Sequence, residues 1–255
     1  MAERPLILVC NDDGVRAPGI EALAAAMADL GDVVVVAPDR EMSAMSHSIS
    51  LHRPLRVEEL RRNWYAVDGT PVDCAYLGLL HLAPRKPALV VSGVNAGYNL
   101  GTDVFYSGTV AAAVEGALRK IPAIAVSRER GYGDDYGPAA GLARALGAAV
   151  LQHGLPPGIL LNVNVPSAKG PAGYRWTCLG ERLYHDKVDV RSDPRGRKYF
   201  WIGGPEVGFG DVPGSDCLAV RDGVCSVTPL ELDFTHQPLL AEVPGWRLDG
   251  FEHVR

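Results

Sequence analysis

Short apolar runs alternate with longer amphipathic stretches over roughly the first two thirds of the chain. Each run is apolar almost throughout, as expected for a strand that is covered on both faces of a parallel sheet. The stretches between the runs are rich in alanine, and larger apolar residues recur in them at helical spacing. The predicted strands cover residues 6–10, 33–37, 88–92, 123–127 and 159–164, and the predicted helices cover 19–30, 109–119 and 138–153.

This alternation of strand and helix predicts parallel strands joined by right-handed crossovers. We therefore expect an α/β fold with a doubly wound, mostly parallel, Rossmann-like sheet in a core of about residues 1–166. The rest of the chain, about 167–255, is expected to form a β-rich C-terminal extension. Together the two parts make one predicted domain of residues 1–255.

The pattern of apolar and polar residues in the extension differs from that in the core. Its strand-like runs cover residues 174–179, 199–203 and 220–229. A charged stretch at 186–197 separates the first two runs and suggests either an antiparallel hairpin or an excursion off the sheet. The final segment, 239–254, is apolar without a helical period. Its composition leaves two alternatives equally open, namely packing on its own domain and packing on another subunit.

Composition narrows the possible functions. With 255 residues, 47% of them apolar and a formal net charge of −5, the chain lacks the basic character of most nucleic-acid binders. It has no apolar run long enough to span a membrane, and its start lacks the pattern of a signal peptide. The five cysteines are scattered and odd in number, which is typical of reduced thiols. We therefore expect a cytoplasmic protein with neither a nucleic-acid nor a membrane partner.

Ligands of an open parallel sheet bind at the loops that follow the carboxyl ends of its strands. Three such loops are polar here: Asn11–Gly14, Pro38–Ser48 and Gly93–Asn99. The third continues to Ser107-Gly108-Thr109, directly before a predicted helix. The candidate chemistry is therefore concentrated at one edge of the predicted sheet.

The first loop places Asp12 beside Asp13 at the end of a buried strand, where two carboxylates repel each other unless a cation compensates. Hard ions such as Mg²⁺ and Mn²⁺ prefer oxygen ligands. Carboxylates of Asp12 and Asp13, the amide of Asn95 and the hydroxyl of Ser43 would provide them. The alternative is an ordinary turn, since asparagine, aspartate and glycine favour turns.

The second signal is the helix start at Ser107, Gly108 and Thr109. Free backbone N–H groups and the helix dipole make such a start suitable for a phosphate. The alternative is a plain helix cap, which is the commoner use of serine and threonine at this position. The loop is not a Walker A motif, because it lacks the lysine.

His47 is a candidate general acid because of its titration range and its place in a polar loop. A lone histidine in a serine-rich loop is more often structural or merely exposed, and both readings stay open. Cys74 has no apparent histidine partner, so a thiol nucleophile is not expected.

In these loops and the sequence around them, the chain closely resembles the SurE (survival protein E) family of metal-dependent nucleotidases, which release phosphate from nucleoside monophosphates. The matching blocks occur in the family's order along nearly the whole chain. They are residues 8–14, 36–40, 47–49, 69–74, 91–97, 107–116, 161–166 and 227–230. The sequence departs from the family's pattern at two positions. Cys10 stands where threonine is common in the family, and Ser46 stands where glycine is common.

The resemblance implies one divalent ion per subunit, Mg²⁺ or Mn²⁺, held by Asp12, Asp13, Ser43 and Asn95. It implies a phosphate site formed by Asn95, Asn99, Ser107, Gly108 and Thr109. It also implies a homodimer or homotetramer in which the C-terminal segment is exchanged between subunits.

The expected reaction is hydrolysis of nucleoside 5′-monophosphates by attack of metal-activated water. Asp12 or Asp13 would accept a proton, and His47 would donate one to the leaving ribose oxygen. The 3′-monophosphates and short polyphosphate are open as further substrates. One alternative is a nucleotide-binding or sensing module without turnover. A phosphatase that forms an aspartyl-phosphate is a further rival, but it usually has Asp-x-Asp after the first strand.

Overall fold

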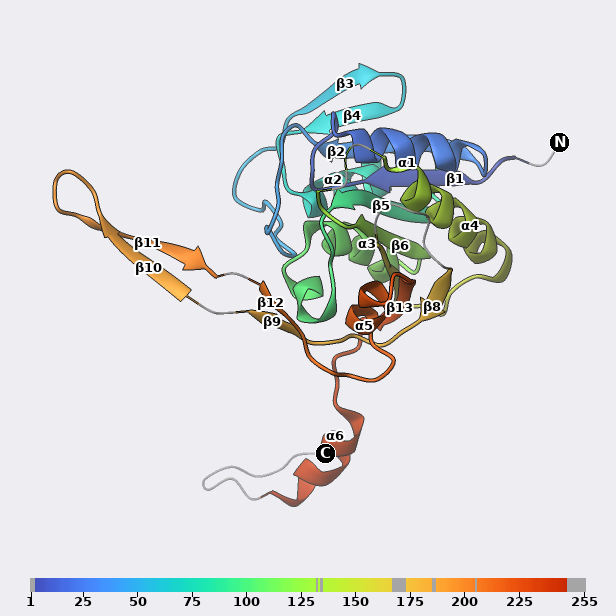
Figure 1. Cartoon of the computed structure of the whole chain (residues 1–255). Helices are drawn as coiled ribbons and strands as arrows, with labels where there is room; N and C mark the ends of the chain where they lie inside the picture. Colours follow the sequence, from blue (N-terminus) through green and yellow to red (C-terminus); the bar gives the residue numbers. More distant parts are fainter. Residues whose placement is uncertain are drawn as a thin grey trace.

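The computed structural model describes residues 3–131, 133, 135–166, 173–184, 187–204 and 206–246. In this part of the chain the main sheet has nine strands in the order β3-β4-β2-β1-β5-β6-β7-β13-β8 (Figure 1). Their bounds are β1 Leu6–Cys10, β2 Asp32–Pro38, β3 Val57–Arg61, β4 Trp64–Val67, β5 Leu89–Ala96, β6 Ala123–Arg128, β7 Ile159–Val165, β8 Tyr174–Trp176 and β13 Cys225–Glu231. The predicted α/β class, with its mostly parallel sheet, is confirmed.

The six strands from β4 to β7 run parallel to their neighbours. At one edge β3 pairs antiparallel with β4, and at the other β13 pairs antiparallel with β7 and parallel with β8. The sheet therefore continues past residue 166, because the extension adds β13 and β8 to its far edge.

Helices cover both faces of the sheet. The described α-helices are α1 Pro18–Ala28, α2 Pro71–Leu77, α3 Gly108–Leu118, α4 Gly137–His153, α5 Asp216–Arg221 and α6 Gln237–Glu242. Three short helices of other types are η1 Gly78–Leu82, η2 Gly101–Phe105 and η3 Val243–Gly245. On one face α1 and α4 pack over Ile7 and Val9 of β1. On the other face α2 and α3 pack over Leu6, Leu8 and Cys10 of the same strand. Because successive side chains of a strand point to opposite faces, an unbroken apolar β1 fills both layers.

The extension forms an arm and a tail that leave the body (Figure 1). In the arm, β9 Arg182–Tyr184 pairs with β12 Glu206–Phe209, and β10 Lys187–Ser192 pairs with β11 Lys198–Gly203. A hairpin is present in the arm, but its strands differ from the predicted ones. Its first strand, β10, lies in the charged stretch 186–197, and the segment 174–179 instead contributes β8 to the main sheet. In the tail, α6 buries none of its residues.

Four short elements differ from the predicted pattern. The segment 220–229 is not one strand, because α5 ends at Arg221 and β13 begins at Cys225. The tail contains the helix α6, although 239–254 shows no helical period; residues 247–255 lie outside the described residues. The hairpin of β3 and β4 was not predicted. Nor was α2, which begins with a capping box of Thr70 and Asp73.

Within the described part of the chain, no helix is both long and apolar enough to cross a membrane.

Candidate active site

The acidic turn, Asn11–Gly14, lies directly after β1 and carries the predicted pair of carboxylates, Asp12 and Asp13. Asn11 shapes the turn, since its Nδ2 donates to Gly14 O at 2.8 Å and its Oδ1 accepts from Gly14 N at 3.2 Å. This pair of hydrogen bonds closes an Asx-type turn directly after the strand. Asp12 is buried and Asp13 is half-buried.

Asp12 is joined to the start of α3. The hydroxyl of Thr109 donates to Asp12 Oδ1 in a short hydrogen bond. A Cβ on Gly108 would lie 2.9 Å from the Cβ of Asp12, so only glycine allows this close approach. The predicted metal-binding turn and the predicted phosphate-binding helix start are therefore in direct contact.

Asp13 is joined to the end of β5. Its Oδ2 accepts a hydrogen bond from Ala96 N at 3.1 Å. The adjacent Asn95 donates its Nδ2 to Gly97 O at 2.8 Å, which leaves Oδ1 of its amide available. The pairing of β5 with β6 is irregular between Ser92 and Asn95, directly before the residue that bonds Asp13.

Ser43 lies in the loop after β2. The preceding residue, Met42, donates its N–H to Asp12 O at 2.8 Å, which fixes this loop against the acidic turn. The hydroxyl of Ser43 itself donates to Glu41 Oε1 at 2.9 Å. Glu41 was not predicted as a site residue, yet its charge lies close enough to Asp13 to act on the pKa of that carboxyl.

Burial governs the protonation of both aspartates. It raises the pKa of Asp12 to about 6; the hydrogen bond from Thr109 opposes this rise and the charge of Asp13 adds to it. Burial also raises the pKa of Asp13. The hydrogen bond from Ala96 N–H lowers this pKa, and the negative charge of Glu41 raises it. The two groups are thus held in a setting that disfavours two negative charges without a cation.

These residues fit a hard divalent cation. Among the described residues nothing donates a hydrogen bond to Oδ1 of Asp13 or to Oδ1 of Asn95, so each offers a lone oxygen to an ion. No cluster of three or more histidine, cysteine, aspartate or glutamate side chains occurs in the same part of the chain. A site of mixed carboxylate, amide and hydroxyl oxygens suits Mg²⁺ or Mn²⁺ better than zinc.

His47 is hydrogen-bonded to a carboxylate further along α3. His47 Nε2 lies 2.7 Å from Oε1 of Glu115, a buried carboxylate of α3. Glu115 is six residues beyond Thr109 on that helix, or about 9 Å along its axis. Burial alone would raise the pKa of Glu115, but hydrogen bonds from His47 and Arg119 hold it below its ordinary value. The acid role of His47 stays a prediction, and in this structure its partner is a carboxylate.

Ser46, where the family commonly has glycine, has a φ of 53°, in the left-handed region that favours glycine. Its hydroxyl donates to Phe105 O at 2.6 Å and its N–H to Tyr106 O at 3.1 Å. The serine therefore adds one hydrogen bond between this loop and the loop that leads to Ser107. Ser107 itself caps α3, since its Oγ accepts from Val110 N at 3.1 Å.

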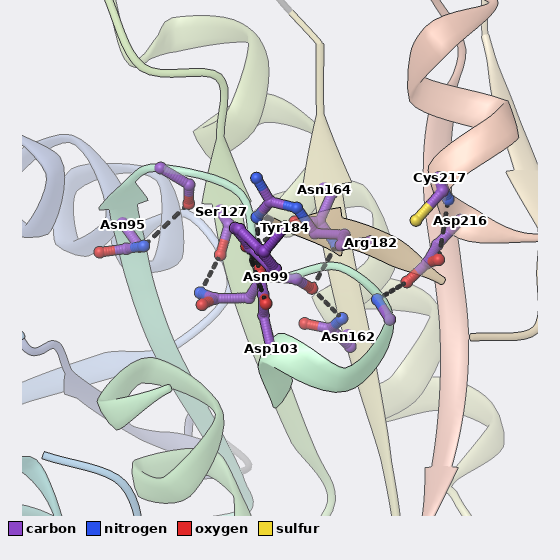
Figure 2. A network of polar contacts seen from close by, with 12 residues as sticks. Asn95, Asn99, Asp103, Ser127, Asn162, Asn164, Arg182, Tyr184, Asp216 and Cys217 are labelled. Atoms are coloured by element: carbon purple, nitrogen blue, oxygen red, sulfur yellow. Dashed lines mark hydrogen bonds and ion pairs between the residues drawn. The ribbon is translucent and has the colours of Figure 1, made fainter. Parts of the chain in front are cut away.

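Asn99 is held by a buried polar network (Figure 2). Asn164 accepts from the backbone N of Asn99 at 2.8 Å and donates to its backbone O at 3.1 Å. Asn162 donates to the same carbonyl at 2.8 Å, and the Asn99 side chain donates to Ser127 Oγ at 2.7 Å. Asparagines of β7 thus fix the backbone of the predicted phosphate loop.

Two more carboxylates hold the same loop further along (Figure 2). Oδ2 of the fully buried Asp216 accepts from Gly101 N at 2.9 Å, and its Oδ1 accepts from Gly180 N and Cys217 N at 2.7 and 2.8 Å. Asp103 is held by Arg182 and by the hydroxyl of Tyr184, both on β9. The root of the arm is therefore attached to the loop that joins Asn99 to Ser107.

The prediction missed several of these supporting residues. Ligands bind at the carboxyl ends of parallel strands, and this applies to β6 as well. That strand ends at Arg128, and Glu129 and Arg130 follow it. Charges of Arg130 and Arg128 lower the pKa of Asp13, which places them beside the site. Asn162 and Asn164 gave no such signal, because they alternate with apolar residues inside β7.

Fold and site together define an α/β protein whose paired carboxylates and helix start meet at the carboxyl edge of a parallel sheet. The sequence matches the family "Survival protein SurE" over residues 7–186. The chain belongs to the SurE family.

Named relatives are similar over nearly their whole lengths. The 5′-nucleotidase SurE of Myxococcus xanthus is 53% identical, over 98% of this chain and 97% of that protein. The 5′-nucleotidase SurE of Anaeromyxobacter dehalogenans is 55% identical, over 96% of this chain and 97% of that protein. The crystal structure of the SurE protein from Aquifex aeolicus has a TM-score of 0.84 and 41% identity, and the match covers 94% of this chain and 98% of that one.

Proposed function

We propose that this chain is a divalent-metal-dependent 5′-nucleotidase that hydrolyses nucleoside monophosphates to nucleoside and phosphate. The observation that carries the proposal is the contact of Asp12 with Thr109, which joins a carboxylate pair to a helix start. The names of relatives that are more than half identical support the same activity.

The proposed cation is held by Asp12, Asp13, Asn95 and Ser43. When bound, it supplies a Lewis acid that polarises the phosphoryl group and acidifies a water molecule. The free N–H groups at the start of α3, around Gly108 and Thr109, would bind the phosphoryl oxygens. Asn99, fixed by its network, would line the same phosphate site.

Proton transfer needs an acceptor and a donor. Either Asp12 or Asp13 would accept the proton of the attacking water, and the raised pKa of both carboxyls suits that role at neutral pH. His47 remains the candidate donor to the leaving oxygen. For that role its side chain would have to leave Glu115, to which it is bound at 2.7 Å.

Metal removal tests the proposal directly. We expect phosphate release from AMP and GMP to disappear in excess EDTA and to return on addition of Mn²⁺ or Mg²⁺, because the carboxylate pair alone provides no Lewis acid. A phosphate assay with both metals in turn measures this and identifies the better ion. A protein that binds AMP but releases no phosphate with either metal would instead be a nucleotide-binding or sensing module.

Three finer points belong to the same proposal. One ion per subunit is proposed, because one group of oxygen ligands is formed by the part of the chain that the structure describes. Cleavage of 3′-monophosphates and of short polyphosphate would use the same phosphate site. A cytoplasmic location is inferred from the scattered thiols, since Cys10 and Cys74 lie buried on the same face of the sheet without forming a disulfide.

We further propose a homodimer or homotetramer in which the C-terminal tail packs on a neighbouring subunit. Apolar side chains of the tail are exposed in the single chain, with Phe234 at 78%, Leu240 at 53% and Trp246 at 64%. The tail also leaves the body of its own subunit (Figure 1). An exposed apolar patch of this kind usually marks an interface.

Assembly is tested by light scattering. We expect the full chain to have the mass of a dimer or tetramer at micromolar concentration, and Leu240→Glu to shift it toward the monomer, because a charge would be buried at the interface. Leu80→Glu, at an exposed leucine of the body, is the matched control. A wild-type protein that is monomeric under these conditions would refute the exchanged tail.

A further inference from the structure

The loop between β5 and α3 carries two residues of the proposed phosphate site, with Asn99 near its start and Ser107 at its end. The middle of the loop is the short 3₁₀ helix η2. Helices of this type have poor hydrogen-bond geometry and are rarely longer than about four residues, so they depend on contacts with the rest of the protein. The position of η2, and with it the spacing of Asn99 and Ser107, is therefore set by whatever holds this helix.

Asp103 is the residue of η2 that connects the two ends of the loop. Its N–H donates to Leu100 O at 3.0 Å, and its carbonyl accepts from Tyr106 N at 2.9 Å. Leu100 directly follows Asn99, and Tyr106 directly precedes Ser107. A contact that fixes Asp103 therefore fixes the backbone beside both phosphate-site residues.

The side chain of Asp103 is held by two residues of β9, at the root of the arm (Figure 2). Arg182 forms a short ion pair with Oδ2, and the hydroxyl of Tyr184 lies 3.0 and 2.9 Å from the two carboxylate oxygens. The side chains of Asp103 and Arg182 are only 19% and 11% exposed, so water screens their attraction less than that of a surface pair. We call Asp103, Arg182 and Tyr184 the clamp.

The strand that carries two members of the clamp has support of its own. Arg182 begins β9, which pairs with β12, and the preceding Glu181 O accepts from Gly210 N at 2.8 Å. The base of the arm also lies directly against the loop, since a Cβ on Gly101 would be 2.4 Å from Gly180 O. The clamp therefore joins the phosphate loop to a paired strand and not to a free side chain on the surface.

The end of η2 also supports the loop that carries Ser43 and His47. Ser46 of that loop donates its hydroxyl to Phe105 O at 2.6 Å and its N–H to Tyr106 O at 3.1 Å. A displacement of η2 would therefore reach both the proposed phosphate site and the loop of a proposed metal ligand.

We propose that Asp103, held by Arg182 and Tyr184, is a positioning residue of the enzyme that sets the spacing between the two ends of the phosphate site. It would act on the substrate only through Asn99 and Ser107. A displacement of about 1 Å in a substrate-positioning group can cost on the order of a hundredfold in rate. This inference rests on the proposed nucleotidase function, to which it adds a residue that acts through the phosphate loop.

Asp103→Asn tests the clamp, because asparagine keeps the size of the side chain and removes its charge. We expect KM for AMP and the inhibition constant of inorganic phosphate to rise by about tenfold each. A purely structural loss would lower the amount of folded enzyme, and hence kcat, without changing either constant. Asp222→Asn is the matched control, because the ion pair of Asp222 with Arg175, at 3.4 Å, joins α5 to the edge strand β8, and both constants should keep their wild-type values.

The partners of Asp103 provide a second readout. Arg182→Gln should raise both constants as Asp103→Asn does, and the double variant should be no worse than either single variant, because both changes remove one contact. Arg182→Lys keeps the positive charge and should restore most of the lost affinity. Tyr184→Phe leaves the ion pair in place and should raise KM by about twofold.

Three results would overturn the positioning role. The first is wild-type constants in Asp103→Asn, with or without a lower melting temperature. The second is a double variant whose effect equals the product of the single effects, because the two residues would then act separately. If Asp103→Asn does not fold, equal constants in Arg182→Lys and Arg182→Gln would be the third, because the charge of the partner would then be irrelevant.

The failure of the underlying function gives a different result. Calorimetry of inorganic phosphate binding in Mg²⁺ requires no turnover. A wild-type protein that releases no phosphate from AMP, but binds inorganic phosphate more tightly than Asp103→Asn does, would remove the nucleotidase proposal and support the clamp. A wild-type protein that hydrolyses AMP with the same KM as Asp103→Asn would remove the clamp alone.

Discussion

Asp12→Asn is expected to lower kcat/KM for AMP by on the order of a thousandfold, the largest effect of any single substitution in the site. The change keeps the shape of the side chain but removes the negative charge that would hold the cation. Several kcal/mol of transition-state stabilisation depend on that cation. A phosphate-release assay at saturating Mn²⁺ measures the loss. The control is Asp29→Asn, at an exposed aspartate that follows the last residue of α1.

The same variant should remain folded, and this separates chemistry from stability. The pKa of Asp12 is raised to about 6, so the stability that depends on its protonated form is lost as the pH rises through that value. Asparagine has no such proton, so the metal-free variant should be more stable than wild type at pH 7.5, by about 2 kcal/mol. Full activity in Asp12→Asn would show that the metal assignment is wrong.

Asp216→Ala is expected to cause the largest loss of stability. The fully buried carboxylate accepts hydrogen bonds from the backbone N–H groups of Gly101, Gly180 and Cys217. Alanine leaves all three donors without a partner, and we expect a loss of roughly 3–5 kcal/mol. Thermal unfolding should therefore shift downward by about 10 °C.

The control for this prediction lies at the other end of the same helix. Asp222 is exposed at the C-terminus of α5, and Asp222→Ala should change the melting temperature by a degree or two. Asp216→Asn should fall between the two variants, since its amide keeps one acceptor oxygen. If Asp216→Ala melts like wild type, the carboxylate does not hold the three segments together.

Strong local signals made the core predictable. Strands such as β1 are apolar without interruption, because both of their faces are covered, and their regular alternation with amphipathic stretches of helical spacing identifies them as strands. The short helix α5 was not predicted, and its last two residues fall inside the predicted strand 220–229. Its six residues adjoin the apolar run of β13, and periodicity cannot distinguish helix from strand over so few positions.

A readable signal for α2 was available. Thr70 and Asp73 have the spacing of a capping box, and Pro71 stands at the first helical position, where proline is favoured. Local capping chemistry therefore identifies helices that are too short to show a periodic apolar face.

One local rule leads to the predicted ligand residues, because they lie at or soon after strand ends. The two aspartates follow β1, Asn95 is the last residue but one of β5, and Ser43 lies in the loop after β2. Their supports were not predictable in this way. Asn164 contacts Asn99 across 65 residues of sequence, and Asp216 contacts Gly101 across 115. Such pairs depend on the order of strands in the finished sheet, which no local pattern contains.

The exposed arm and tail also determine the tryptophan fluorescence of the protein. Trp201 of the arm and Trp246 of the tail are 62% and 64% exposed, and Trp176 at the sheet edge is 56% exposed. Only Trp64, stacked under Arg61, is shielded among the four tryptophans of the chain. An isolated subunit should therefore fluoresce like indole in water, and a shift of its emission to shorter wavelength on concentration would follow assembly without any label.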